Sequence, residues 1–302
     1  MHLDDLKGFS KNIEGDLIFD FDIKKFSWFN IGGKSKIFFK PYNLKELKDF
    51  LVLYNERGKI FILGAGSNVL FKDEVYEGVI IKLGINFSNI SILEDNKLIA
   101  GAACYQRRLS EFAKDNSLSG LEFMSCIPGT IGGGIRMNSG CFGKEFKDSI
   151  LSVQVIDYKG NIKSILSNKI KFNYRDTDLD KNIIFLSATF KTMKGEKKII
   201  YKLMSELKYK KNISQPSKIK TGGSTFKNPK NQTDKKVWEL IKSSVPENIS
   251  FGDAVISEKH SNFFQNKKNA SYSDMNCLIE YVKNRVKNNT GIDLSLEIVI
   301  VD

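Results

Sequence analysis

The sequence predicts an α+β fold with a larger N-terminal part and a smaller C-terminal part. Apolar residues at helical spacing and short strand-like apolar runs are interspersed along the chain. A length of 302 residues allows more than one core. The polar segment 208–220 interrupts these patterns and is the expected domain boundary.

A capped helix is predicted in the N-terminal part. Residues 44–54 carry apolar side chains at helical spacing, Asn43 precedes them as the N-cap, and Glu46 completes a capping box. Gly58 is expected to end this helix. Further helical patterns lie at 109–116 and 199–207.

Short apolar runs predict the strands of the N-terminal part. These runs are 60–63, 79–83, 151–158, 162–166 and 183–190. The sequence Lys159-Gly160-Asn161 is typical of a turn, so it is expected to join two of the runs into a hairpin.

The C-terminal part has its own set of elements. Ser271 and Asp274 have the spacing of a capping box at the start of a long helix, and Gly291 is expected to end that helix. The alternating run 294–301 predicts a final strand. A shorter helix is expected at 237–241 and a strand at 254–256.

The charge of the chain does not indicate a nucleic-acid-binding protein. The formal net charge of +12 comes mostly from lysines scattered along the sequence. We interpret them as a solvated coat, with steering of anionic ligands as the alternative. Basic motifs interleaved with aromatic residues are missing, as is any signature of an RNA-recognition sheet, so no nucleic-acid partner is expected.

Other classes are disfavoured by what the sequence lacks. Two histidines and four cysteines without a CxxC pair do not match the ligand pattern of a zinc site, and free thiols are expected. Apolar runs stay short of the roughly 20 residues of a membrane span. The first residues, 1–5, are acidic and lack the apolar segment of a secretory signal. We therefore expect a cytoplasmic monomer with no metal.

A first glycine-rich loop follows the predicted strand 60–63. The loop consists of Gly64, Ala65, Gly66, Ser67 and Asn68. Its bare backbone could form an anion-binding nest or simply a tight turn. The third glycine of a dinucleotide fingerprint is missing and no helix is expected after it, so it is not a Rossmann loop.

A second glycine-rich block covers residues 119–143. A Pro-Gly turn leads into a run of glycines, and isoleucines and a methionine are interleaved with them. Apolar anchors with bare backbone between them suit a chain that packs against a flat, extended ligand. The alternative is a buried, turn-rich core segment.

Three polar side chains are candidates for chemistry. Ser224 follows a Gly-Gly pair, so it is either a nucleophile or proton donor on exposed backbone, or a structural serine. Arg175 follows Tyr174 and could clamp a carboxylate through its guanidinium, or pair with Asp176 at the surface. Glu297 lies on the opposite face of the last strand from its leucines and isoleucines, either towards solvent or in a cleft.

Taken together and in this order, these segments resemble the MurB family of UDP-N-acetylenolpyruvoylglucosamine reductases. The resemblance extends from about residue 28 to residue 301, nearly the whole chain. The matching segments are LGAGSN from Leu63, SGLEF…IPGT.GG…MN.G..G from Ser119, the Tyr174-Arg175 pair, GGSTFKNP from Gly222, SEKHSNF from Ser257, and the final LEI.

The resemblance implies a fold and a reaction. The fold would be a two-subdomain FAD-binding fold of the vanillyl-alcohol-oxidase (PCMH) type plus a smaller C-terminal α+β substrate-binding domain. Subdomain 1 would cover 1–83, subdomain 2 would cover 84–207 and the substrate domain 208–302, with 294–302 returning to subdomain 1. NADPH would reduce FAD, and hydride would pass to UDP-N-acetylglucosamine enolpyruvate, giving UDP-N-acetylmuramate for peptidoglycan synthesis.

The resemblance also implies roles for individual residues. Ser224 would donate a proton, Arg175 would bind the substrate carboxylate, and Glu297 would be the catalytic acidic residue, either protonated or orienting another donor. FAD contacts would come from Gly64 to Asn68, Ile127, Pro128, Gly129, Thr130, Gly132, Gly133 and Asn138. Substrate contacts would come from Tyr174, Lys227 and Asn228.

The chain departs from the family pattern at small residues. Cys126 stands where glycine is common, Cys141 where alanine is common, and Thr177 where serine often follows the Tyr-Arg pair. Little room separates Arg175 from the next strand, so the shorter, second type of the family is expected, without the inserted tyrosine-bearing loop. The alternative is a related FAD-dependent oxidase of a hydroxy acid or aldonolactone, in which a cysteine could tether the flavin.

Overall fold

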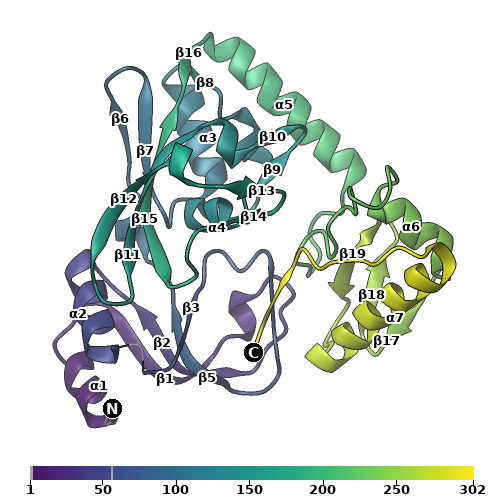
Figure 1. Ribbon diagram of the computed structural model, residues 1–302, viewed down its shortest axis with the longest axis horizontal. Helices are drawn as coiled ribbons and strands as arrows, with labels where there is room; N and C mark the ends of the chain where they lie inside the picture. Colours follow the sequence, from purple (N-terminus) through teal and green to yellow (C-terminus); the bar gives the residue numbers. More distant parts are fainter. Residues whose placement is uncertain (1–2, 56) are drawn as a thin grey trace. The chain divides into compact units, whose positions relative to one another are not determined.

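The computed structural model describes residues 3–55 and 57–302 (Figure 1). Met1 and His2, on which the prediction about a secretory signal partly rests, lie outside these ranges. The chain divides into two compact units, each made of three segments. Unit 1 comprises Met1–Phe19, Ile37–Ala65 and Gly78–Lys211, and unit 2 comprises Asp20–Lys36, Gly66–Glu77 and Asn212–Asp302. The three domains predicted from the sequence stay a prediction.

The first sheet has four strands. In sheet order they are β1 (Asp16–Asp22), β2 (Lys34–Lys40), β5 (Tyr76–Ile81) and β3 (Lys59–Ile62). Helix α2 (Leu44–Tyr54) buries Leu47, Phe50 and Leu51 against side chains of these strands, and α1 (Leu3–Ser10) adds Leu6 to the same core of unit 1. Burial of this apolar stripe is what holds α2 in place.

The capping box at α2 is only half formed. The Asn43 side chain accepts a hydrogen bond from the Glu46 N–H at 3.0 Å, as predicted. The Glu46 carboxylate does not return to Asn43; it accepts from the N–H groups of Glu14 (2.7 Å), Gly15 (3.2 Å) and Tyr42 (2.8 Å). The helix ends at Asn55, in the left-handed conformation with φ 47°, and not at Gly58 as expected.

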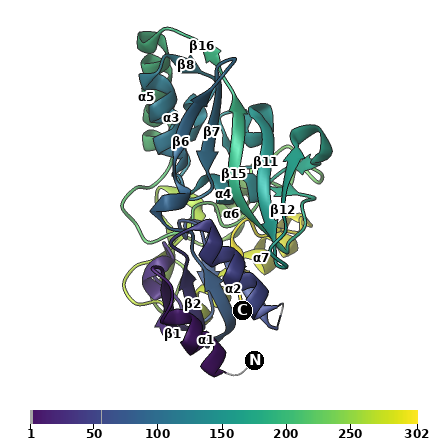
Figure 2. The same ribbon diagram turned by 90° about the vertical axis from the view of Figure 1, so that its left-hand side faces the viewer.

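The second sheet of unit 1 is antiparallel and has five strands (Figure 2). In sheet order they are β12 (Ile162–Leu166), β11 (Ile150–Asp157), β15 (Ile183–Lys191), β7 (Lys97–Gly101) and β6 (Ile90–Leu93). The predicted hairpin between β11 and β12 is confirmed, with Gly160 at φ 84° in its turn. The sheet packs against α3 (Gln106–Asp115) and α4 (Ile131–Arg136).

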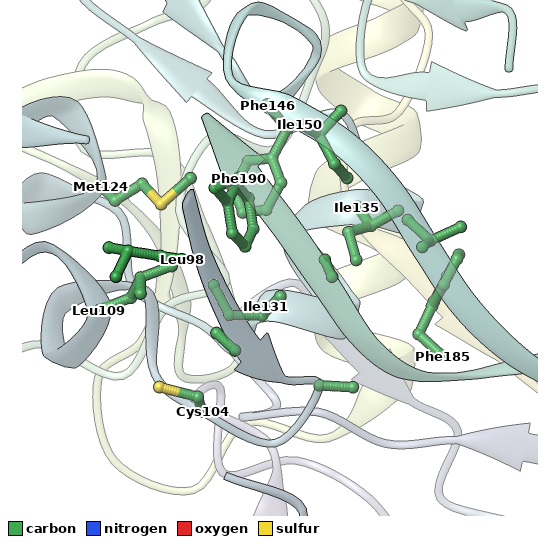
Figure 3. Packing of buried hydrophobic residues seen from close by; sticks show 14 of the residues in the cluster. Leu98, Cys104, Leu109, Met124, Ile131, Ile135, Phe146, Ile150, Phe185 and Phe190 are labelled. Atoms are coloured by element: carbon green, nitrogen blue, oxygen red, sulfur yellow. The ribbon is translucent and has the colours of Figure 1, made fainter. Parts of the chain in front are cut away.

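Helix α4 carries the glycine-rich block into the core of unit 1. Figure 3 shows Ile131 and Ile135 in the same cluster as Phe146 and Phe190, whose ring centroids lie 5.9 Å apart. A Cβ on Gly134, on the same helix, would collide with the ring of Phe146. Close packing against Phe146 therefore requires glycine at position 134, although glycine has a low helix propensity.

Short elements complete unit 1. The paired strands are β8 (Leu118–Ser119) with β16 (Met193–Lys194), β9 (Gly140–Cys141) with β10 (Lys144–Glu145), and β13 (Phe172–Asn173) with β14 (Asp176–Thr177). The 3-10 helices are η2 (Ile85–Phe87), η3 (Glu122–Cys126), η4 (Phe146–Asp148) and η5 (Ser167–Lys169), while η1 (Lys24–Phe26) belongs to unit 2.

Unit 2 contains a three-stranded antiparallel sheet covered by two helices (Figure 1). Its strands are β17 (Ser250–Phe251), β18 (Ala254–Ser257) and β19 (His260–Asn266), and its helices are α6 (Val237–Ser244) and α7 (Tyr272–Thr290). The capping box of Ser271 and Asp274 and the end of α7 at Gly291 are as predicted. The two helices and the sheet enclose a core that includes Phe29 and Leu70.

The last strand of unit 2 is shorter than predicted. Only β20 (Val299–Val301) is regular, and it pairs in parallel with β4 (Val69–Phe71). Residues 294–298 instead form isolated contacts with the segment around Phe226. The helical pattern 199–207 is longer than predicted, because α5 (Lys197–Ser214) extends into the polar segment 208–220. Within the described ranges, no helix has the length and apolarity needed to cross a membrane.

Candidate active site

Gly64, which opens the first glycine-rich loop in unit 1, lies against Thr130 of the second. A Cβ on Gly64 would lie 2.7 Å from the hydroxyl oxygen of Thr130, so only glycine permits this approach. Among residues 3–55 and 57–302, the N–H groups of Gly64, Ala65 and Gly66 meet no acceptor. Three consecutive free amides on a bare turn form the kind of nest that binds phosphate oxygens. As predicted, the described residues directly after the loop form no helix; they form the strand β4. The loop therefore fits the diphosphate of a dinucleotide.

Gly66 fixes the shape of this loop in unit 2. Its φ is +72°, and a Cβ would collide with the carbonyl oxygen of Phe26. The Gly66 carbonyl accepts from the Trp28 N–H at 3.0 Å. A side chain at position 66 would thus both strain the backbone and push the loop away from η1.

The second loop is held in place by Gln106, a residue that was not predicted from the sequence. The Gln106 N–H donates to the Gly129 carbonyl at 3.0 Å, and the Gln106 amide donates to the Thr130 carbonyl at 3.3 Å. Thr130 itself caps α4 by accepting from the Gly133 N–H at 3.4 Å. The buried side chain of Gln106 therefore fixes the course of residues 128–133. No local sequence pattern around Gln106 predicts this role.

Lys82 is a second residue missed by sequence reasoning. Its ammonium donates to the carbonyl oxygen of Gly64, next to the three free amides. Burial lowers the pKa of Lys82, with a smaller contribution from the positive charge of Lys40. A partly desolvated cation beside a nest of amides strengthens the attraction of this loop for an anion.

Asn138 is fully buried and tied into its surroundings. Its amide nitrogen donates to Glu145 and to the Asn173 carbonyl, each at 3.0 Å, and its oxygen accepts from the Lys147 N–H at 3.1 Å. These contacts connect the end of α4 with the hairpin β13–β14. The predicted contact of Asn138 with FAD stays a prediction, and the structure gives this side chain a clear positioning role.

Arg175 lies at the tip of that hairpin, in unit 1. Tyr174 and Arg175 form the two-residue turn, and Arg175 has a left-handed φ of 57°. Its guanidinium donates to the Gly140 carbonyl at 2.9 Å, approaches Glu145 at 3.9 Å, and lies 5.1 Å from the centroid of the Tyr174 ring. These contacts hold the guanidinium group of Arg175 in one orientation, as a preorganised binding site for a carboxylate requires.

The chain segments that carry Ser224 and Glu297 are hydrogen-bonded to each other in unit 2. Glu297 donates its N–H to the Thr225 carbonyl at 2.8 Å, and Lys227 donates its N–H to the Ser295 carbonyl at 2.8 Å. The carbonyl of Glu297 accepts from the Asn68 amide at 3.0 Å. The predicted proton donor, the predicted acidic residue and the end of the first loop thus belong to one hydrogen-bonded group of segments.

Asn262 holds the Ser224 segment in place. Its amide nitrogen donates to the Phe226 carbonyl at 2.9 Å, and its oxygen accepts from the Phe226 N–H at 3.0 Å. Both groups are buried. Asn262 lies in the SEKHSNF segment, whose place in the family pattern was the only signal for it.

Asn228 lies in the loop before α6, and its side chain reaches the first residue of that helix. Its side-chain oxygen accepts from the Val237 N–H at 3.0 Å. This contact positions the side chain, and the predicted contact with substrate stays a prediction. Among the described residues, no group of three or more His, Cys, Asp or Glu side chains is arranged to hold a metal ion.

Sequence models of two domain families match the chain. Residues 35–165 match the family described as an FAD binding domain, and residues 215–301 match the C-terminal domain of UDP-N-acetylenolpyruvoylglucosamine reductase. With the α+β fold and the loop of free amides, these matches define an FAD-binding oxidoreductase. The fold class and the cofactor FAD predicted from the sequence are confirmed.

Similarity to individual proteins identifies the family. The UDP-N-acetylenolpyruvoylglucosamine reductase of Pelagibacter ubique is 56% identical over 301 residues, 100% of each chain. That of Rickettsia conorii is 42% identical over 286 residues, 95% of this chain and 96% of the relative. The crystal structure of the Thermus caldophilus reductase has a TM-score of 0.81 at 26% identity and covers 96% of this chain and 100% of its own. The chain belongs to the UDP-N-acetylenolpyruvoylglucosamine reductase (MurB) family.

Proposed function

We propose that this protein reduces UDP-N-acetylglucosamine enolpyruvate to UDP-N-acetylmuramate, with NADPH as reductant and FAD as cofactor. The reaction serves peptidoglycan synthesis. The observation that carries the proposal is the 56% identity to a reductase of this name over its full length. The free amides in the first loop support it, as does the backbone hydrogen bond that joins the segment of Glu297 to Thr225, the residue after Ser224.

The residues that would hold FAD follow from the two loops. The amides of Gly64, Ala65 and Gly66 would bind its diphosphate, and the backbone of residues 127–133 would lie along the rest of the molecule. FAD supplies hydride-transfer chemistry that no amino-acid side chain provides. The protein contributes the fixed course of both loops, through Gln106 and Lys82.

Arg175 would bind the carboxylate of the enolpyruvyl group. Hydride addition at one carbon builds negative charge on the neighbouring carbon and on this carboxylate. A fixed guanidinium meets that charge without reorganising, because Gly140 and the Tyr174 ring already hold it. Preorganised donors of this kind contribute about 3–4 kcal/mol to transition-state stabilisation.

Ser224 would supply the proton that completes the reduction. A serine hydroxyl is a weak acid, but an enolate carbon is a strong base, and the charge of Lys227 offsets the alkoxide that remains. Glu297 would act either as a protonated acid or by orienting the donor, because an ionised carboxylate alone repels an enolate. Tyr174, Lys227 and Asn228 would complete the binding of the nucleotide sugar.

The setting of the reaction is also proposed. The enzyme would act in the cytoplasm as a monomer, and it would bind NADPH and a nucleotide sugar there. The excess of positive charge, +12, favours the encounter with two polyanionic substrates. Light scattering coupled to size-exclusion chromatography would measure the mass of the particle, with one chain of 34.3 kDa expected.

The decisive experiment uses the colour of the purified protein. We expect a yellow protein that releases FAD, loses its colour with NADPH and regains it when UDP-N-acetylglucosamine enolpyruvate is added without oxygen. A protein that is bleached by a hydroxy acid or an aldonolactone but not by NADPH would contradict the proposal. That result would instead support a related FAD-dependent oxidase.

A further inference from the structure

Trp238 is a large aromatic side chain that unit 2 leaves at its surface. It lies in α6, which buries Val237, Leu240 and Ile241 in the core, whereas Trp238 is 41% exposed. Tryptophan has a large apolar ring and is mostly buried in folded proteins. An exposed tryptophan is therefore available to bind a flat ligand, and its neighbours decide which ligand that is.

The position of Trp238 is fixed by two contacts within unit 2. The Ser261 hydroxyl donates to the Trp238 carbonyl at 2.6 Å, which ties the start of α6 to β19. The rings of Trp238 and His260 meet edge to face, with centroids 6.4 Å apart and planes at 60°. These contacts orient the indole and leave it exposed, as a preorganised binding surface requires.

A series of aromatic rings connects Trp238 with the segment of Ser224. The His260 ring contacts the Phe263 ring at a centroid distance of 4.8 Å. Phe263 in turn pairs with Ser224 in an isolated antiparallel bridge. The exposed tryptophan and the predicted proton donor therefore lie at the two ends of one packed series within unit 2.

The residues predicted to bind the substrate lie next to Trp238. The side-chain oxygen of Asn228 accepts from the N–H of Val237, the residue before Trp238, at 3.0 Å. Lys227 precedes Asn228 in the chain. Residues 227–242 carry five lysines and two acidic residues, so this part of the surface has an excess of positive charge. Such an excess attracts the diphosphate of a nucleotide.

We propose that Trp238 binds the uracil base of the nucleotide-sugar substrate by stacking. The inference rests on the proposed function, which supplies this substrate. The enolpyruvyl group and the uracil lie at opposite ends of the molecule, with the diphosphate between them. Ser224, the pair Lys227 and Asn228, and Trp238 follow one another in the same order along unit 2. A base presents a flat π-face, and an exposed indole stacks on it.

The experiment measures binding of UDP to the FAD-loaded protein by calorimetry. The unchanged protein should bind UDP, and Trp238→Ala should weaken the binding by about 5- to 150-fold, as expected for loss of one base–aromatic stack. Trp238→Phe should keep most of the affinity, because the smaller ring still stacks. Tyr201→Ala, at a side chain that is 63% exposed on α5 of unit 1, is the matched control and should bind UDP normally.

Two further measurements separate the base from the rest of the ligands. Inorganic pyrophosphate has no base, so its affinity should be the same in Trp238→Ala as in the unchanged protein. In steady-state kinetics, Trp238→Ala should raise KM for the enolpyruvyl nucleotide and leave kcat unchanged. Reduction of the flavin by NADPH should keep its rate and its dependence on NADPH concentration, because the proposed stack serves uracil and not the rings of NADPH.

A footprinting experiment reads the stack in the unchanged protein, so it does not depend on whether a variant folds. Hydroxyl radicals oxidise exposed tryptophan rings, and mass spectrometry locates the products. UDP should protect Trp238, whereas Trp28, which is 45% exposed, serves as the internal control and should be oxidised equally with and without UDP. Pyrophosphate should protect neither.

Four results would overturn the inference. They are failure of the unchanged protein to bind UDP, unchanged UDP affinity in Trp238→Ala, equal losses of affinity for UDP and pyrophosphate, and no protection of Trp238 by UDP. Calorimetry and footprinting need no turnover, so they test the stack even in a protein without reductase activity. Conversely, a protein that completes the proposed reaction but binds UDP equally well without the indole would reject the inference alone.

Discussion

Glu297 donates its backbone N–H to the carbonyl oxygen of Thr225 at 2.8 Å, which fixes the segment of Ser224 beside the segment of Glu297. The contact is between backbone groups, so it survives any change of the two side chains. Side-chain substitutions at positions 224 and 297 therefore test chemistry and not the course of the chain. This separation makes the predicted roles accessible to mutation.

Replacing Ser224 by alanine should slow only the half-reaction that consumes the enolpyruvyl nucleotide. A general acid typically contributes a factor of about 10²–10⁴, and that loss is expected in stopped-flow reoxidation of the flavin. Flavin reduction by NADPH should keep its rate. Thr225→Val is the matched control, because the neighbouring Thr225 hydroxyl is buried without a hydrogen-bond partner among the described residues. Equal slowing of both half-reactions would exclude Ser224 as the proton donor.

Replacing Arg175 by lysine should lower kcat/KM for the nucleotide by about 10²-fold, although the charge is unchanged. Lysine provides a point charge and loses the planar fork. The left-handed backbone at position 175 strains both residues to a similar extent, so the change does not add backbone cost. Steady-state kinetics of Arg175→Lys should be compared with Arg107→Lys, at an exposed ion pair with Glu111. Wild-type turnover of Arg175→Lys would show that Arg175 is not the clamp.

Replacing Asn262 by alanine should destabilise the protein by about 2–6 kcal/mol. The change leaves the buried N–H and carbonyl of Phe226 without partners, and each such group costs about 1–3 kcal/mol. Urea denaturation followed by tryptophan fluorescence measures the difference. Asn276→Ala, at a weak contact of 3.5 Å with Tyr272, should change the free energy of unfolding little. A small effect of Asn262→Ala would mean that the Ser224 segment is held by other contacts.

His260 should make stability depend on pH below neutrality. Burial lowers the pKa of His260 beneath its ordinary value of 6.5, and its ring lies between those of Trp238 and Phe263. Because the unfolded chain takes up the proton at a higher pH, this stability is fully present above about pH 6.5. It is lost progressively as the pH falls from there towards the pKa of the folded state.

The free energy of unfolding, measured from pH 5 to 8, checks this expectation. His260→Gln should remove part of the decline below pH 6.5 and leave the region above it unchanged in slope. The difference between the two curves isolates His260 from the carboxylates, which titrate at lower pH. Parallel curves would contradict the prediction.

Local signals in the sequence were reliable where cause and effect lie within a few residues. Ser271, Asp274 and Gly291 define the ends of α7 because each acts on neighbouring backbone groups. Only half of the capping box predicted at Asn43 and Glu46 is formed, and it is the local half. The Glu46 N–H meets Asn43 three residues away, but its carboxylate turns to N–H groups 31 and 32 residues away, which no local pattern encodes.

The candidate site shows the same limit more strongly. The two glycine-rich loops were visible because bare backbone is conspicuous in a sequence. The residues that hold them were not, because Gln106 and Lys82 act on backbone groups 24 and 18 residues away. Asn262 likewise acts across 36 residues. Resemblance to the family is the only basis for the roles given to Ser224, Arg175 and Glu297. Local sequence patterns cannot supply these roles, because the chemistry of the three side chains depends on a substrate.

The pairing of β20 with β4 has a consequence for how the protein is made. Asn68 and Glu297, which meet at this pairing, are 229 residues apart, and unit 2 draws its segments from both ends of that interval. A nascent chain on the ribosome therefore carries Phe29 and Leu70 without their core partners until residues 212–302 have been translated. Exposure of such side chains during synthesis promotes aggregation, so demand for a chaperone should be highest before the C-terminal third emerges.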